Sequence, residues 1–424
     1  MLEKLKQIWK IKDLRKSIIF VGLMLIIFRI AAHIPVPGVN TTGLKKLFES
    51  NQLLGLINVF SGSSMENFSI VMLGVAPYIT ASIIFQLLAM VVPKLEALSK
   101  EGEYGRQKIN QWTRWLTVPL AVLQAFGMIT ILKQSAGQVL LGLTNWQLLM
   151  AVITITAGTV FLMWLGELIS EKHIGNGISL LIFAGIVSGL PKTMGKSFFT
   201  FDQAEMINMI LFGIIALITI IGVVIITEGQ RNIPVSYARQ VRGNKMYGGV
   251  DTYLPLRVNQ AGVIPIIFAI SIILFPPMIA QLFLQVKTVW LASAARWTIN
   301  IFQDQLVYGI LYFLMVVAFT YFYTAVIFHP DQIAENLQKQ GGFVPGIRPG
   351  KSTTEYLQKI VTRIIFTGAL FLGVIAILPL ITAQLTGTQS LVIGGTSLLI
   401  VVSVVIETVN QINAQLSMRD YEEI

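Results

Sequence analysis

Long apolar stretches alternate with short polar segments along the whole chain, and Arg29 is the one charged residue inside an apolar stretch. Each stretch comes close to the roughly 20 residues that a helix needs to cross a bilayer core. Hydrocarbon offers backbone groups no outside partner, so helices are the expected form. The ten stretches are 17–32, 68–92, 115–132, 148–166, 174–190, 207–227, 261–286, 306–328, 364–383 and 391–406. The pattern predicts an all-α polytopic membrane protein with about ten transmembrane helices.

Composition agrees with that prediction. Hydrophobic residues make up 54% of the 424 positions and charged residues 12%, whereas soluble domains carry about 25% charged residues. The chain has no cysteine, which excludes disulfides and thiolate metal sites. The net charge of +10 arises from lysines and arginines that gather between the apolar stretches, so their placement carries more information than their sum.

The basic residues alternate between the two sides of the predicted bundle. Six precede the first stretch, and five each follow the second, sixth and eighth stretches, while the opposite set of connections carries seven in all. By the positive-inside rule, both termini are expected in the cytoplasm. We expect the basic start and first apolar run to be a retained span rather than a cleaved signal peptide.

The ten stretches divide five and five around a polar interval near 191–205. Such a division suggests two structural repeats, with residues 1–195 as the N-terminal half and 196–424 as the C-terminal half. An odd number of spans per half reverses the starting side, so the halves would be inverted relative to each other around a central pathway.

Residues suited to catalysis are scattered. The histidines His33, His173 and His329 lie far apart near stretch ends, which predicts structural roles, no metal site and no cofactor. The segment 346–352 ends like a phosphate-binding loop but lacks the required first glycine. The chain is therefore not expected to be an enzyme. A secondary small-solute transporter is the alternative, although it predicts polar or charged groups at mid-membrane, where these stretches are neutral.

Two connections, near 228–258 and 329–362, are long, basic and rich in glycine. They exceed what neighbouring helices need. One interpretation is that they fix topology and touch anionic lipid. Their length favours the other, a protruding surface on which a partner docks.

Five motifs give the chain a family resemblance. They are LGVAPYITASII at 73–84, GNGIS at 175–179 with FAGI at 183–186, LPLRVN at 254–259 with AGVIP at 261–265, FVPGIRPG at 343–350, and GGTSLLI at 394–400. In this order, over essentially the whole chain, they resemble the SecY/Sec61 family of protein-conducting channels, in its bacterial form.

The resemblance implies a channel whose waist is a ring of aliphatic side chains and whose outer funnel is closed by a short plug. The matching waist residues are Val75, Ile79, Ile182, Ile186, Ile267 and Ile400. The positions 75/79 and 182/186 are i,i+4 pairs, which place both members on one helix face. The plug segment, near 55–66, contains Leu56, Ile57, Asn58, Val59, Phe60 and Ser61.

The resemblance also assigns a lateral gate and a docking surface. Thr80, Gln124 and Asn259 match a polar gate cluster whose buried groups are expected to satisfy one another. Arg239, Arg242, Lys245, Arg257 and Arg348 match the cytoplasmic surface for partners. The implied partners are SecE and SecG subunits, the SecA ATPase motor, the ribosome, signal peptides, nascent or unfolded polypeptides and membrane lipids. The implied function is to move unfolded polypeptides across the bacterial cytoplasmic membrane and to release apolar segments sideways into lipid.

Overall fold

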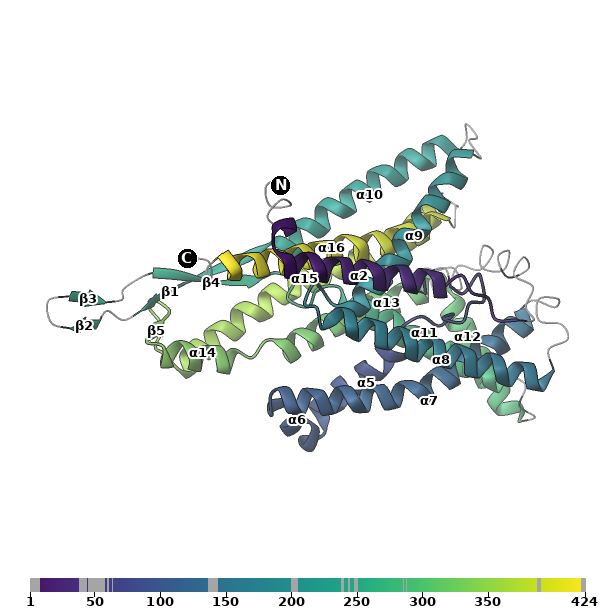
Figure 1. The fold of residues 1–424 in the computed structure, drawn as a ribbon, viewed down its shortest axis with the longest axis horizontal. Coiled ribbons are helices and arrows are strands. Elements are labelled where there is room, and N and C mark those ends of the chain that lie inside the picture. The colour runs from purple at the N-terminus through teal and green to yellow at the C-terminus, as the bar shows by residue number, and fades with distance from the viewer. Residues whose placement is uncertain are drawn as a thin grey trace.

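A computed structural model describes residues 8–37, 44, 58, 61–62, 64–135, 144–199, 205–237, 240–242, 245–247, 251–284, 286, 288–386 and 390–420. Each of the ten predicted stretches overlaps a helix. These helices are α2 (Lys12–Ala31), α5 (Ala76–Val91), α7 (Glu103–Ser135), α8 (Asn145–Ser170), α9 (Gly177–Phe199), α10 (Glu205–Glu228), α11 (Ile264–Phe283), α13 (Gln305–Ile327), α15 (Lys351–Thr386) and α16 (Ser390–Asp420). Most run roughly along the long axis of the molecule (Figure 1).

Five helices are long and apolar enough, on their described residues, to cross a membrane: α8, α11, α13, α15 and α16. A sixth span results if α5 and the short α6 (Pro93–Lys100), which are bent by 103°, count together. Pro93 explains the bend, because proline disfavours helical geometry in the residue before it. The apolar part of α2 is interrupted by Arg29, and α9 and α10 contain shorter apolar segments. The chain is a multi-pass membrane protein.

The predicted connection at 228–258 is more ordered than the sequence indicated. It forms an antiparallel hairpin of β1 (Gln230–Tyr237) and β4 (Asp251–Arg257), extended by β2 (Gln240–Arg242) and β3 (Lys245–Tyr247). Strand β5 (Gly342–Phe343), from the second long connection, pairs with β1 and completes the order β4-β1-β5. The two long connections therefore form one projection, which lies at one end of the molecule (Figure 1).

This projection has a small core of its own. Ile233, Leu256 and Val344 are buried against Leu357 and Val361 of α15. Helix α14 (Pro330–Lys339) packs beside α15 and β5. Because α15 continues into the membrane bundle, the projection is fixed to the bundle by a helix rather than by a flexible connection.

The main core runs through the centre of the bundle. It gathers buried side chains from α2, α5, α8, α9, α11, α13, α15 and α16. A second cluster joins α7 and α8 to the segment between α2 and α5, where Phe68 and Met72 are buried. The remaining helix, α12 (Val289–Gln303), lies at the end of the molecule opposite the strands (Figure 1).

Candidate functional site

The six predicted waist residues all belong to the central cluster. Each is less than 8% exposed, although they come from four separate parts of the chain. Val75 and Ile79 lie at the start of α5, Ile182 and Ile186 on α9, Ile267 on α11 and Ile400 on α16. Helix α5 contacts α11, and α9 contacts α16, so residues from both halves meet. The structure thus brings the six into one cluster; that they line the waist of a pore stays a prediction.

The chemistry of this cluster suits a barrier rather than a binding site. Aliphatic side chains offer no fixed charge and no directional hydrogen bond. A constriction of such side chains blocks ions by excluding water, and it has no preference for the sequence of a chain passing through it.

Part of the plug segment can be placed. Leu56, Ile57, Val59 and Phe60 lie outside the described residues, whereas Asn58 and Ser61 are described and buried. The Ser61 hydroxyl donates to the Asn58 carbonyl at 2.8 Å. The Asn58 amide nitrogen donates to a Glu66 carboxylate oxygen at 3.3 Å, and its amide oxygen accepts from the Glu66 backbone N–H at 3.1 Å. These bonds give the C-terminal end of the plug segment a defined shape.

The same end docks on two helices. The Arg29 guanidinium of α2 donates to the Gly62 carbonyl at 2.8 Å. Gly62 also lies directly against Gly185 of α9, because a Cβ added to Gly185 would lie 2.6 Å from the Gly62 Cα. Gly185 immediately precedes the waist residue Ile186. The docking point of the plug segment is therefore next to the predicted waist.

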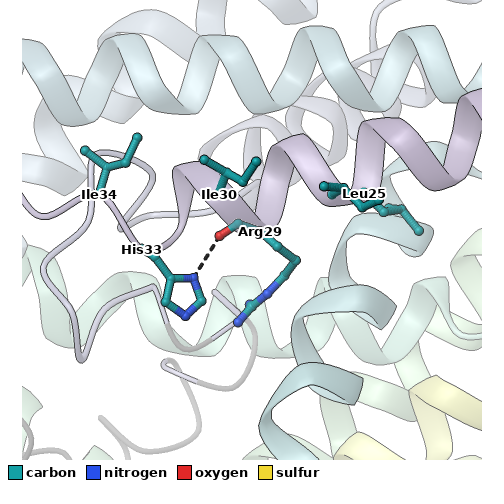
Figure 2. Close-up of a pocket in the computed structure, with 6 residues that line it drawn as sticks. Leu25, Arg29, Ile30, His33 and Ile34 are labelled. Atoms are coloured by element: carbon teal, nitrogen blue, oxygen red, sulfur yellow. Dashed lines mark hydrogen bonds between the residues drawn. The ribbon is translucent and has the colours of Figure 1, made fainter.

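The sequence did not predict this contact. The sequence feature that could have pointed to a role for Arg29 is that it is the one charged residue inside the apolar stretches. Leu25, Ile26, Arg29 and Ile30 on α2, together with His33 and Ile34 just after its end, line an open groove of about 630 Å³. Figure 2 shows the Arg29 and His33 side chains on one side of the helix end and Ile30 and Ile34 on the other. His33 Nδ1 lies 2.8 Å from the Arg29 carbonyl, which fixes the ring at the end of α2.

The three predicted gate residues are buried. Thr80 lies on α5 and Gln124 on α7, and these two helices contact each other and α11, whereas Asn259 lies five residues before α11 begins. The expectation that they satisfy one another is wrong in this structure. The Thr80 hydroxyl donates to the Ala76 carbonyl at 3.0 Å, and the Asn259 amide donates to the Gly262 carbonyl at 3.1 Å. Within the described part of the chain no hydrogen bond joins Thr80, Gln124 and Asn259. A threonine on a helix readily reaches its own i−4 carbonyl, which explains the local bond.

Asn259 nevertheless keeps one unused polar atom. Its amide oxygen is buried and accepts no hydrogen bond from the described residues. An unsatisfied buried acceptor raises the free energy of the arrangement that contains it. A donor from a segment that enters between α5, α7 and α11 would relieve that cost.

The predicted docking residues are spread over the projection. Arg239 lies outside the described residues. Arg242 and Lys245 pair directly opposite each other at the β2–β3 end. Arg257, at the base of β4, pairs with Gln230 and is exposed, and Arg348 is exposed in the turn before α15. The basic side chains are thus distributed along the projection rather than gathered in one cluster. Among the described residues, no group of three or more metal-ligating side chains occurs.

Comparison with known proteins gives a consistent result. The SecY family model matches residues 69–409. The SecY translocase subunit of Halalkalibacterium halodurans is 44% identical over 432 residues, which cover 100% of this chain and 99% of the relative. That of Corynebacterium glutamicum is 44% identical over 440 residues, with 98% of each chain covered.

Solved structures share the fold. A protein-conducting channel superposes with a TM-score of 0.64 at 18% identity, covering 93% of this chain and 91% of the other. Sec61 in the canine ribosome-channel complex superposes with a TM-score of 0.62 at 18% identity and the same coverage. The extent of the family match and the identity over the full length place the chain in the SecY family.

Proposed function

We propose that this chain is the pore-forming subunit of a channel that conducts unfolded polypeptides across the bacterial cytoplasmic membrane and releases transmembrane segments laterally into lipid. The observation that carries the proposal is that six buried aliphatic residues, from both halves of the chain, belong to one central cluster. Membership of a family of translocase subunits supports it. A small-solute transporter would instead need polar or charged groups at that depth.

The seal is proposed to have two layers. The waist residues exclude water and ions, and they can separate to admit an extended chain because only van der Waals contacts join them. The plug segment adds a second barrier beside the waist. Its docking through Arg29 and Gly185 supports this role, because these contacts hold the segment at a defined point beside the waist residues.

Lateral release is proposed to occur where α5 and α7 of the first half meet α11 of the second. The three helices are largely apolar, and Thr80 on α5, Gln124 on α7 and Asn259 before α11 are buried polar side chains. An apolar signal helix entering there would replace one set of apolar contacts by another, at modest cost in free energy.

The partners follow from charge and family. The basic projection suits the SecA motor or the ribosome, since cations attract acidic protein surfaces and polyanionic ribosomal RNA. The fold shared with a ribosome-bound channel supports the second partner. Energy has to come from such a partner, and SecE and SecG are the expected companions within the membrane. The excess of lysine and arginine in the N-terminal segment and the two long connections supports cytoplasmic placement of the projection and both termini.

Conductance in planar bilayers tests this function. The chain, purified with its partner subunits, is compared with a variant lacking residues 56–61. Silent native channels and large, weakly selective openings in the variant are expected. If both proteins stay silent while vesicles accumulate a labelled small solute, the channel assignment is wrong and a transporter is favoured.

A further inference from the structure

Helix α12 divides into three sectors around its axis. Successive residues on a helix are about 100° apart, so residues seven apart lie nearly in line. Trp290 and Trp297 fall on one line and are 73% and 69% exposed. The outward apolar sector holds Trp290, Ala294, Trp297 and the partly buried Ile301. The inward sector holds Leu291, Ala295 and Phe302, and the polar sector holds Ser293, Arg296 and Asn300, with the exposed Val289 at its start.

The inward sector is already occupied. Ala295 is buried, Phe302 packs against the central cluster, and α12 contacts both α11 and α13. One residue, Asp304, separates α12 from α13, and its carboxylate accepts hydrogen bonds from the backbone N–H groups of Leu306 and Val307 at 2.9 and 3.3 Å. The tryptophan sector is therefore not part of the protein core, and its direction is fixed by the helices that α12 joins.

The depth of α12 in the membrane follows from α13. That helix has 23 residues, which span roughly 35 Å, slightly more than the roughly 30 Å of the hydrocarbon core. Its first residue, Gln305, therefore lies near one membrane surface, and α12 ends two residues earlier. Phe283 at the end of α11 and Leu306 and Ile310 at the start of α13 are exposed as well. The lipid-facing apolar surface thus continues onto α12.

We propose that α12 lies in the membrane interface at the end of the bundle opposite the projection, with its tryptophan sector among the phospholipid head groups and upper acyl chains. Tryptophan favours this zone because its ring is largely apolar while its N–H can reach water or a head group. Three sectors, one toward protein, one toward lipid and one toward water, are what a helix lying in that plane requires. Arg296 in the polar sector suits the phosphates.

The proposal depends on α11 and α13 crossing the membrane and not on conduction of polypeptide. If the proposal holds, α12 limits how far the end of α11 can move. Helix α12 holds the end of α11, the helix that carries Ile267 and borders the proposed gate, at a fixed depth relative to the lipid surface.

Neighbouring spin labels test the proposal, and the absence of cysteine makes labelling specific. Single variants Ala294→Cys and Ser293→Cys are labelled, and the chain with its partner subunits is placed in vesicles of phosphatidylethanolamine and phosphatidylglycerol. We expect the label at 294 to collide mainly with oxygen, which dissolves in lipid, and the label at 293 to collide mainly with a water-soluble nickel chelate. Adding Trp290→Ala and Trp297→Ala should raise nickel collisions at 294 and leave a label at Leu217→Cys, on α10, unchanged.

Two results would overturn the proposal. Equal nickel access at both positions would mean that α12 stands in water. A label at 294 that is shielded from both oxygen and nickel would mean that protein, not lipid, covers the tryptophan sector.

Discussion

Replacement of Gly185 by alanine should loosen the plug while leaving the helix that carries it intact. The new Cβ would lie 2.6 Å from the Gly62 Cα, whereas non-bonded carbons prefer about 3.5–4.0 Å. The two segments must therefore separate by about 1 Å. Alanine is also a better helix former than glycine, so α9 itself should not be weakened.

The size of the effect follows from the contacts at this point. Crowding the new methyl group against Gly62 should destabilise the docked plug by about 1–3 kcal/mol. Moving Gly62 away from α9 also strains the 2.8 Å hydrogen bond from Arg29 to the Gly62 carbonyl. Arg29 is only half-buried, so we take the low end of the range for a charged hydrogen bond, about 1.5 kcal/mol. Since 1.4 kcal/mol corresponds to about tenfold in an equilibrium constant, the ratio of undocked to docked plug should rise about tenfold or more.

Planar-bilayer recordings at fixed voltage measure this ratio as open probability. The matched control is Gly213→Ala on α10, where an added Cβ meets nothing within 4 Å. We expect more frequent openings for Gly185→Ala and native silence for the control. If Gly185→Ala is as silent as the native channel, contact with α9 does not hold the plug, and the docking assigned here is wrong.

Three further predictions use the same framework. Arg29→Gln removes the charge from the bond to Gly62 and should raise open probability by about tenfold or less; unchanged recordings would leave Gly185 as the main contact. Ile186→Ser places a hydroxyl in the predicted waist and should raise ion leak from loaded vesicles. Leu217→Ser, on the lipid side, is the control and should leave the leak unchanged. Equal leak from both variants would argue against a central barrier. Leu357 is fully buried beneath the sheet, so Leu357→Ala should lower the stability of the projection by about 2–5 kcal/mol. Protease should then cleave the hairpin more readily, while the channel stays closed to ions. Unchanged protease resistance would show that this small core does not hold the sheet.

The membrane architecture was accessible from sequence because it depends on long runs of one residue type. Apolar length located the ten longest helices that the structure describes, and the motifs selected the six predicted waist residues, which the structure places in one buried cluster. The sheet was missed because its strands are short and one of them, β5, pairs with a partner about 100 positions away in the chain. Pro234 and Pro255 inside the strands also weaken the usual β pattern.

The polar contacts were least predictable. The bond from Arg29 to Gly62 joins a side chain to a backbone carbonyl, and a carbonyl is present at every position, so sequence cannot point to one. For the gate residues, a contact was predicted that the structure does not contain. Three buried polar side chains suggested a network, but the Thr80 hydroxyl and the Asn259 amide find backbone carbonyls within four residues, which is closer than any partner on another helix.

Cross-linking of an arrested substrate tests the central claim, that polypeptide passes between the waist residues, most directly. The chain lacks cysteine, so single variants Ile79→Cys, Ile186→Cys and, on the lipid side, Leu217→Cys each offer one thiol to a translocating precursor that carries one cysteine in its middle. Disulfides at 79 and 186, and none at 217, are the result the account predicts. A precursor that is translocated yet never bonds to 79 or 186, or bonds equally to 217, would show that the path lies elsewhere.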